Sequence, residues 1–105
     1  MPRYLFAFHG GHSFKNPSEA GAYMQKWRQW SAGLGDAVVD PGVPVGPSRV
    51  VSPHGVADDG GSNPVSGIML IQATDMSSAL EIAKSCPHVE IGGSLEVAEA
   101  MDMKM

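Results

Sequence analysis

The clearest pattern in the chain lies in residues 65–103, VSGIMLIQATDMSSALEIAKSCPHVEIGGSLEVAEAMDM. Residues 67–73 are almost all apolar, which is typical of a strand that is covered on both faces. Asp75 follows this run, and its carboxylate can accept hydrogen bonds from the first free N–H groups of a helix. Apolar residues then recur at helical spacing, which predicts a buried helix face made of Met76, Ala79, Leu80, Ala83 and Cys86.

The end of this helix is marked by Pro87, which cannot continue it, so the helix is expected to end near Cys86. Gly92 and Gly93 favour a turn. After the turn, residues alternate in the manner of a strand, with one face made of Leu95, Val97, Glu99, Met101 and Met103. The whole stretch therefore predicts a strand, a helix and a second strand.

A resemblance to a known family is visible in residues 67–100, GIMLIQATDMSSALEIAKSCPHVEIGGSLEVAEA. This segment resembles the C-terminal half of the YCII-related proteins, in their DGPF-type branch. That family carries a glycine-led apolar strand, an acidic helix cap, an alanine-rich helix that ends in Cys-Pro, and a Glu-Val strand. The residues that match are Gly67, Asp75, Ala79, Ala83, Cys86, Pro87, Gly93, Glu96 and Val97.

Two departures from the family pattern bear on its pocket chemistry. The Asp-Gly-Pro-Phe signature is absent, and residues 59–64, DGGSNP, stand where it would fall. The Arg-Pro that usually follows the last Glu-Val is replaced by Ala98 and Glu99. The resemblance implies a homodimer in the dimeric α+β barrel manner, whose two sheets pack face to face around a cavity.

The N-terminal part of the chain predicts a second strand–helix pair. Residues 4–8, YLFAF, are apolar on both faces and form the expected strand. Asn16, Pro17 and Glu19 form a typical helix start, with Asn16 as the cap. The helix that follows places one apolar stripe on its surface, and Gly33 and Gly35 can end it. The stripe, which we expect to pack against the sheet, consists of Tyr23, Trp27, Trp30 and Leu34.

The middle of the chain, residues 36–61, is the least regular part and contains four prolines. Residues 37–39 are a possible short strand, and residues 49–52 are the better candidate. Pro53, His54 and Gly55 favour a turn, so a small hairpin is expected at a sheet edge, where prolines are tolerated. The order of elements then predicts one α+β domain over residues 1–105, with the βαββαβ order of a ferredoxin-like fold and an antiparallel sheet.

The apolar character of both strand faces has a consequence for assembly. Both helices of such a fold cover the same face of the sheet, which leaves the opposite face bare. A bare apolar face of this size is rare in monomers. We therefore expect a homodimer that forms through this sheet face.

Composition excludes several other classes of partner. The net charge is −4 and no basic cluster is present, which argues against nucleic acid or an anionic membrane as a partner. No apolar run approaches the length of a membrane helix, and no secretory signal is evident. The single cysteine, Cys86, excludes an intramolecular disulfide and fits a cytoplasmic location. No cofactor is expected, because the chain has no phosphate loop or dinucleotide fingerprint.

Among the candidate site residues, His9 stands first. It follows the first strand and shares the parity of Leu5 and Ala7, so it should face the bare side of the sheet and border the dimer cavity. An imidazole there can act as a general acid or base. Its expected carboxylate partner is Asp59, through the resemblance alone, with Glu96 as the reserve. The structural alternative is a histidine at the end of a strand whose ring is hydrogen-bonded to the backbone.

Other polar candidates have structural explanations that compete with a functional one. His9 and His12 lack a third ligand nearby, so no metal site is expected. Gly10 and Gly11 favour a flexible turn. Asp58 and Asp59 are typical of a solvated turn, while Asp40 has no assigned role.

The candidates in the C-terminal part of the chain also have structural explanations. Cys86 is expected to be structural, because a helix C-terminus raises the pKa of a thiol. His88 is expected at the surface or at a subunit edge, and Glu96 at a cavity or a rim.

Two functions therefore remain open. The first is a non-catalytic or accessory protein whose dimer cavity binds a small organic molecule, with His9 and Glu96 at the ligand. The second is a small enzyme in which His9 and Asp59 carry out proton transfer, elimination or lactone-type chemistry on a small organic acid or phenol. The missing signature residues favour the first.

Overall fold

The fold is described by a computed structural model that covers residues 1–102. Its elements, in chain order, are β1 (Arg3–Gly10), α1 (Pro17–Leu34), the 3-10 helix η1 (Gly35–Ala37), β2 (Val38–Pro44), β3 (Val51–Ser52), β4 (Gly55–Val56), β5 (Val65–Gln72), α2 (Met76–Lys84), α3 (Pro87–Glu90) and β6 (Gly93–Glu99). Met103, which the sequence assigned to the last strand, lies outside the described residues.

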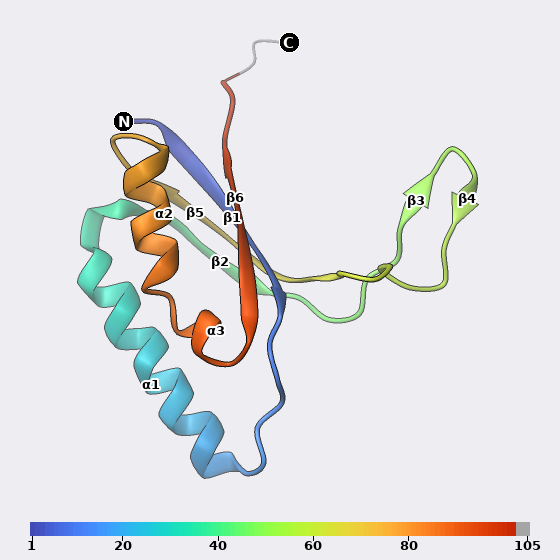
Figure 1. The fold of residues 1–105 in the computed structure, drawn as a ribbon, viewed down its shortest axis with the longest axis horizontal. Coiled ribbons are helices and arrows are strands. Elements are labelled where there is room, and N and C mark those ends of the chain that lie inside the picture. Colours follow the sequence, from blue (N-terminus) through green and yellow to red (C-terminus); the bar gives the residue numbers. More distant parts are fainter. Residues whose placement is uncertain (103–105) are drawn as a thin grey trace.

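A four-stranded sheet forms the centre of the molecule, with the strand order β2-β5-β1-β6. Each neighbouring pair of strands is antiparallel. The helices lie on one side of this sheet, as Figure 1 shows with the sheet seen along its edge. The predicted α+β class with an antiparallel sheet is thus confirmed.

The helix starts form as the sequence predicts. Asn16 caps α1, and its Oδ1 accepts a hydrogen bond of 2.8 Å from the backbone N–H of Glu19. Asp75 caps α2 in the same way, with a 2.8 Å bond from the N–H of Ser78 that lowers the pKa of the Asp75 carboxyl. Gly35, with a φ of 53°, follows the last residue of α1, because glycine tolerates the left-handed conformation.

The core lies between the helices and one face of the sheet. Alternate residues of β1 and β5 are buried there, beside the small residues of α2. The buried set is Tyr4, Phe6, Phe8, Met69, Ile71, Ala73, Ala79, Ala83 and Cys86. Trp27, Trp30 and Leu34 of α1 pack against this cluster but stay partly exposed, so the expected stripe covers the core from outside.

Residues 45–64 form a projection that we call the arm. It leaves the sheet between β2 and β5, and its tip is the hairpin of β3 and β4, in which Val51 pairs with Val56. In Figure 1 the arm extends away from the sheet on the side opposite the helices. The radius of gyration, 15.1 Å, exceeds the roughly 13 Å of a compact chain of this length, in agreement with such a projection.

Several expectations for the middle of the chain and for α2 were wrong. The edge strand of the main sheet is β2, not residues 49–52, and the expected hairpin belongs to a separate two-stranded sheet. Two irregularities in the β2–β5 register allow Pro41 and Gly42 to lie within an edge strand. Met76 and Leu80 were expected in the buried face of α2 but are exposed, while Ile82 packs against the core.

Among residues 1–102, no helix combines the length and apolar character needed to cross a membrane.

Candidate functional site

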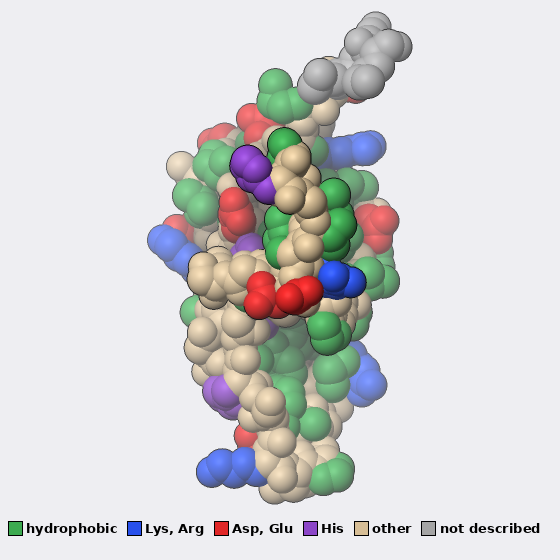
Figure 2. Space-filling model, turned by 90° about the vertical axis from the view of Figure 1, so that its right-hand side faces the viewer, with side chains coloured by type: hydrophobic (Ala, Val, Ile, Leu, Met, Phe, Trp, Pro, Cys, Tyr) green, Lys and Arg blue, Asp and Glu red, His purple; other side chains and the backbone are tan. Residues whose placement is uncertain are grey.

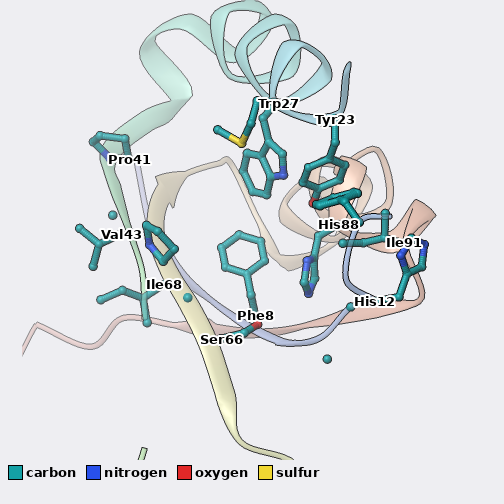
Figure 3. A pocket seen from close by; sticks show the side chains of 17 residues that line it. Phe8, His12, Tyr23, Trp27, Pro41, Val43, Ser66, Ile68, His88 and Ile91 are labelled. Carbon is teal, nitrogen blue, oxygen red and sulfur yellow. The ribbon is translucent and has the colours of Figure 1, made fainter. Parts of the chain in front are cut away.

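A cavity of about 470 Å³ opens on the helix side of the sheet, between α1, the end of β1 and the edge strand β2. Figure 3 shows side chains from these elements and from the α3 region converging on it. The lining residues are Phe8, Gly10, Gly11, His12, Phe14, Tyr23, Met24, Trp27, Pro41, Gly42, Val43, Pro44, Ser66, Gly67, Ile68, His88 and Ile91. Its size falls within the roughly 300–1,000 Å³ of small-molecule sites.

The walls of this cavity are aromatic. Phe8 forms its floor and makes edge-to-face contacts with Trp27, at 5.5 Å between ring centroids, and with His88, at 5.4 Å. Tyr23 continues the wall toward Phe14, whose ring centroid is 4.9 Å away. Rings arranged in this way offer both faces and edges to a flat apolar guest.

His88 is a second histidine that lines the cavity, besides His12. The sequence placed His88 at the surface, and this expectation was wrong, because only 7% of the residue is exposed. Helix α2 already ends at Lys84, and Pro87 instead begins α3, with Cys86 as its N-cap. This extra turn carries His88 back over the sheet. Nε2 of His88 donates to the backbone carbonyl of His9 at 2.9 Å, since a carbonyl can only accept.

Two glycines make the room that His88 occupies. A Cβ atom on Gly93 would lie 2.7 Å from Cε1 of His88 and would overlap Nε2 and Cδ2 more severely. A Cβ on Gly11 would lie 2.9 Å from the same Cε1, and Gly11 also has a φ of +92°. The imidazole is therefore held in a closely fitting slot between the ends of β1 and β6.

The electrostatics of the cavity are nearly neutral. None of the lining residues carries a carboxylate, an ammonium or a guanidinium group. Burial raises the pKa of the Tyr23 phenol above its ordinary value, and the nearby Cys86 and Glu90 act in the same direction. Tyr23 therefore stays protonated at neutral pH. Ser66, at the irregularity in the β1–β5 register, has a buried Oγ without a hydrogen-bond partner beside this cavity.

His9 lies on the opposite face of the sheet, as its parity predicts. Its Nδ1 is 3.1 Å from the carbonyl oxygen of Asn63 and 3.2 Å from that of Pro64, and its Nε2 is 3.2 Å from Oε1 of Glu96. Because carbonyls only accept, Nδ1 carries the hydrogen, and Nε2 donates to Glu96 only in the doubly protonated ring. Glu96 is largely exposed.

The other expected partner, Asp59, is not brought to His9. Its Oδ1 accepts a 2.9 Å hydrogen bond from the N–H of Gly61 within the arm, which is the local turn that Asp and Gly favour. His9 is also absent from the lining of the helix-side cavity. The sequence thus pointed to His9 and Glu96 on the sheet face away from the helices, and it did not reveal the cavity on the helix side.

Cys86 is a buried free cysteine in the described part of the chain. The thiol of Cys86 is buried beneath the helices, and this burial raises its pKa to about 11. The proximity of Glu90 adds to the increase, while a hydrogen bond from the backbone of His88 opposes it. Within residues 1–102, no group of three or more His, Cys, Asp or Glu side chains is arranged to hold a metal ion.

His88 and Tyr23 are the polar cavity residues that the sequence did not reveal as a site. The available signal was the pair of double glycines, Gly10 with Gly11 and Gly92 with Gly93, which stand at the two chain segments that enclose the ring.

In a comparison with models of known protein families and with curated proteins, the chain matches none of them.

Proposed function

We propose that this protein binds a small, largely apolar molecule with a ring system in the helix-side cavity. The observation that carries this proposal is the aromatic lining of the cavity, which contains no ionic side chain. A guest of about the size of one or two rings fits a volume of about 470 Å³. Burial of its apolar surface would supply the binding energy, at roughly 25 cal/mol per Å².

The polar group that would orient the guest is His88. Its Nε2 is committed to the carbonyl of His9, so in the neutral ring Nδ1 remains as an acceptor. Tyr23 can donate, because its phenol stays protonated. A ligand with one hydroxyl or amide group on an apolar ring would satisfy both residues.

Nuclear magnetic resonance provides a test that needs no known ligand. Indole and cyclohexanol, one aromatic and one aliphatic probe, would be added to ¹⁵N-labelled protein at millimolar concentration. We expect the indole N–H signal of Trp27 and the amide of Gly11 to shift, with a larger effect for indole. The amides of Val51 and Val56, at the tip of the arm, should not move.

A matched pair of variants controls this experiment. Met24→Trp places an indole at the rim of the cavity and should abolish the shifts. Gln29→Trp adds the same side chain to an exposed part of α1 that does not line the cavity, and should leave them unchanged. If neither probe shifts cavity signals, or if both variants behave alike, the proposal is wrong.

The order of the strands supports a further proposal about the family of the chain and its assembly. We infer that the strand order β2-β5-β1-β6, with helices on one side, is a ferredoxin-like arrangement and that the chain is a distant YCII-related protein. Such a chain would form a homodimer through its bare sheet face. On this face Leu5 of β1 pairs with Leu70 of β5, and Leu5 remains exposed. A reducing, cytoplasmic environment suits the unpaired Cys86.

An alternative function rests on the other histidine. His9 has its Nδ1 fixed by backbone carbonyls and its Nε2 near Glu96, which is the arrangement of an oriented acid–base group. In a dimer built on the bare face, this pair would border the space between the sheets. Proton exchange of 2-oxobutanoate in D₂O would reveal such activity.

Controls for the catalytic alternative come from the chain itself. We expect His9→Gln to lose any exchange activity and His54→Gln, in the exposed hairpin turn, to keep it. Exchange no faster than in buffer, or equal loss in both variants, would remove the enzyme from consideration.

A further inference from the structure

The arm is held together by hydrogen bonds and an ion pair between its own residues. The N–H of Ala57 donates to the carbonyl of Val50 at 2.8 Å, and the N–H of Val50 donates to the carbonyl of Asp59 at 3.2 Å. Arg49 closes the base of the hairpin, because its Nε donates to the carbonyl of Ala57 at 2.9 Å and its guanidinium lies 3.7 Å from Asp58. The arm is therefore a preformed projection.

The hairpin has an apolar, uncharged surface, which is unusual for a solvent-exposed segment. Every residue from 49 to 59 is exposed, including Val51 at 76% and Val56 at 57%. Residues 50–57, VVSPHGVA, contain no lysine, arginine, aspartate or glutamate. Isolated two-stranded hairpins are marginally stable, and exposed strand edges are usually protected by charges. This hairpin has the composition of a contact surface.

The position of the arm indicates what it contacts. It extends from the side of the sheet that the helices leave bare (Figure 1), so the hairpin and the bare face border the same open side of the molecule. Figure 2 looks onto this side and shows hydrophobic side chains gathered around the projecting segment. Val43, just before the arm, pairs with Ile68 at the β2 edge of the sheet, where both also line the helix-side cavity, and both are exposed.

The area of the bare face also points to a larger interface. Four strands spaced by about 4.8 Å, each about seven residues long, cover roughly 440 Å² in projection. A standard interface buries about 800 Å² of accessible surface on each partner. The sheet face alone would thus give a small interface even when the relief of its side chains is counted. An additional contact surface on the same side would bring it into the usual range.

We propose that the arm clasps a second copy of this chain, so that the hairpin of each subunit packs its valines against the body of the other. This inference rests on the sheet-face homodimer proposed above. A two-fold axis through the bare face makes both arms reach across in the same way, which yields a closed, self-complementary assembly. The arm carries one arginine, Arg49, which lies against Asp58, and no lysine, which disfavours nucleic acid as the partner. Valines without tryptophan or lysine disfavour a membrane surface.

Sedimentation equilibrium of the wild type and three variants tests the clasp. The wild type is compared with the double variant Val51→Asp/Val56→Asp and with Val89→Asp, which places the same charge at an exposed valine of α3 on the helix side. We expect the arm variant to raise the dimer dissociation constant about tenfold or more, because two desolvated valines are lost from each arm. Val89→Asp should stay within about twofold of the wild type.

The outcomes separate the two proposals. A wild type that is monomeric at all concentrations removes both the sheet-face dimer and the clasp. A dimeric wild type whose dissociation constant is unaffected by the arm variant, but is raised by Leu5→Asp on the bare face, keeps the dimer and overturns the clasp. Loss of thermal cooperativity in the arm variant would show that these exposed valines are needed for folding of the subunit itself, and would overturn the clasp.

A second measurement reports on the arm directly. Val56→Cys can be labelled with bimane at neutral pH, because the native Cys86 thiol is buried and its pKa is about 11. We expect the bimane emission to shift to shorter wavelength as the protein concentration is raised and the dimer forms. Emission that stays constant across the dimerisation range would overturn the clasp.

Discussion

The slot around His88 makes the sharpest prediction about this molecule, through Gly93→Ala. Gly93 has ordinary backbone geometry, so the substitution introduces no φ strain, and its whole effect comes from the added methyl group. That methyl would lie 2.7 Å from Cε1 of His88 and would overlap its Nε2 and Cδ2. Because His88 is closely enclosed, the ring must leave its position, and the hydrogen bond to the carbonyl of His9 must break.

The magnitude follows from two costs. Overpacking of a closely packed site costs about 1–3 kcal/mol, and a buried polar group that loses its partner costs about 1–3 kcal/mol. The two overlap, because moving the ring relieves part of the clash while it breaks the bond. We therefore expect Gly93→Ala to lower the free energy of unfolding by about 2–4 kcal/mol, against a total of about 5–15 kcal/mol for a typical domain.

Urea denaturation followed by circular dichroism measures this change, with Gly21→Ala as the matched control. Gly21 lies in α1, where an added Cβ meets nothing within 4 Å, so alanine should stabilise the protein by about 0.5–1 kcal/mol. In the background of His88→Ala the slot is empty, and Gly93→Ala should then cost less than about 1 kcal/mol. An equal cost of Gly93→Ala in both backgrounds would refute the reasoning that the ring fills the slot.

Three further outcomes are expected. Trp27→Ala should cost about 2–3 kcal/mol in urea denaturation rather than the roughly 3–5 kcal/mol of a fully buried aromatic, because the indole is only partly buried against Phe8, and it should also abolish indole binding. Asn16→Ala should cost about 1 kcal/mol in the same assay, through loss of the cap bond to the N–H of Glu19, while Asn16→Asp should retain it. Burial raises the pKa of the Cys86 thiol to about 11 in the folded protein, so the unfolded thiol ionises first and the stability should fall as pH rises from about 9 to 11. A Cys86→Ser variant that keeps the full fall would contradict this.

The parts of the fold that the sequence predicted are those that local chemistry determines. Asn16 and Asp75 were recognisable because a helix start leaves N–H groups that a short polar side chain satisfies, whatever the rest of the chain does. The buried parity of Phe6 and Phe8 followed from the two-residue period of a strand. These signals need no knowledge of the partner segment, so they survive in a single sequence.

The errors occurred where tertiary packing decides. Leu80 and Ile82 of α2 both lie within reach of an apolar stripe, and only the position of the sheet determines that Ile82 turns inward. The start of the edge strand β2 lies within residues 37–39, which the sequence offered as a possible short strand. Its continuation was missed, because Pro41 and Gly42 are typical of a loop and fit the strand only through two register shifts. The helix-side cavity was not predictable at all, since it depends on how far α1 stands from the sheet.

The two histidines show how one short segment serves both faces of the molecule. Gly10 and Gly11 follow His9 and were interpreted as a flexible turn, yet the N–H of His12 donates to the carbonyl of Ile91 at 2.9 Å and fixes this segment to the end of α3. The side chain of His9 reaches the root of the arm on one face, while its carbonyl holds His88 at the cavity on the other. A ligand that moves His88 must therefore pull on the residue that anchors the arm. We expect binding of indole and dimerisation to be linked through His9, so that the two equilibria influence each other by the same factor.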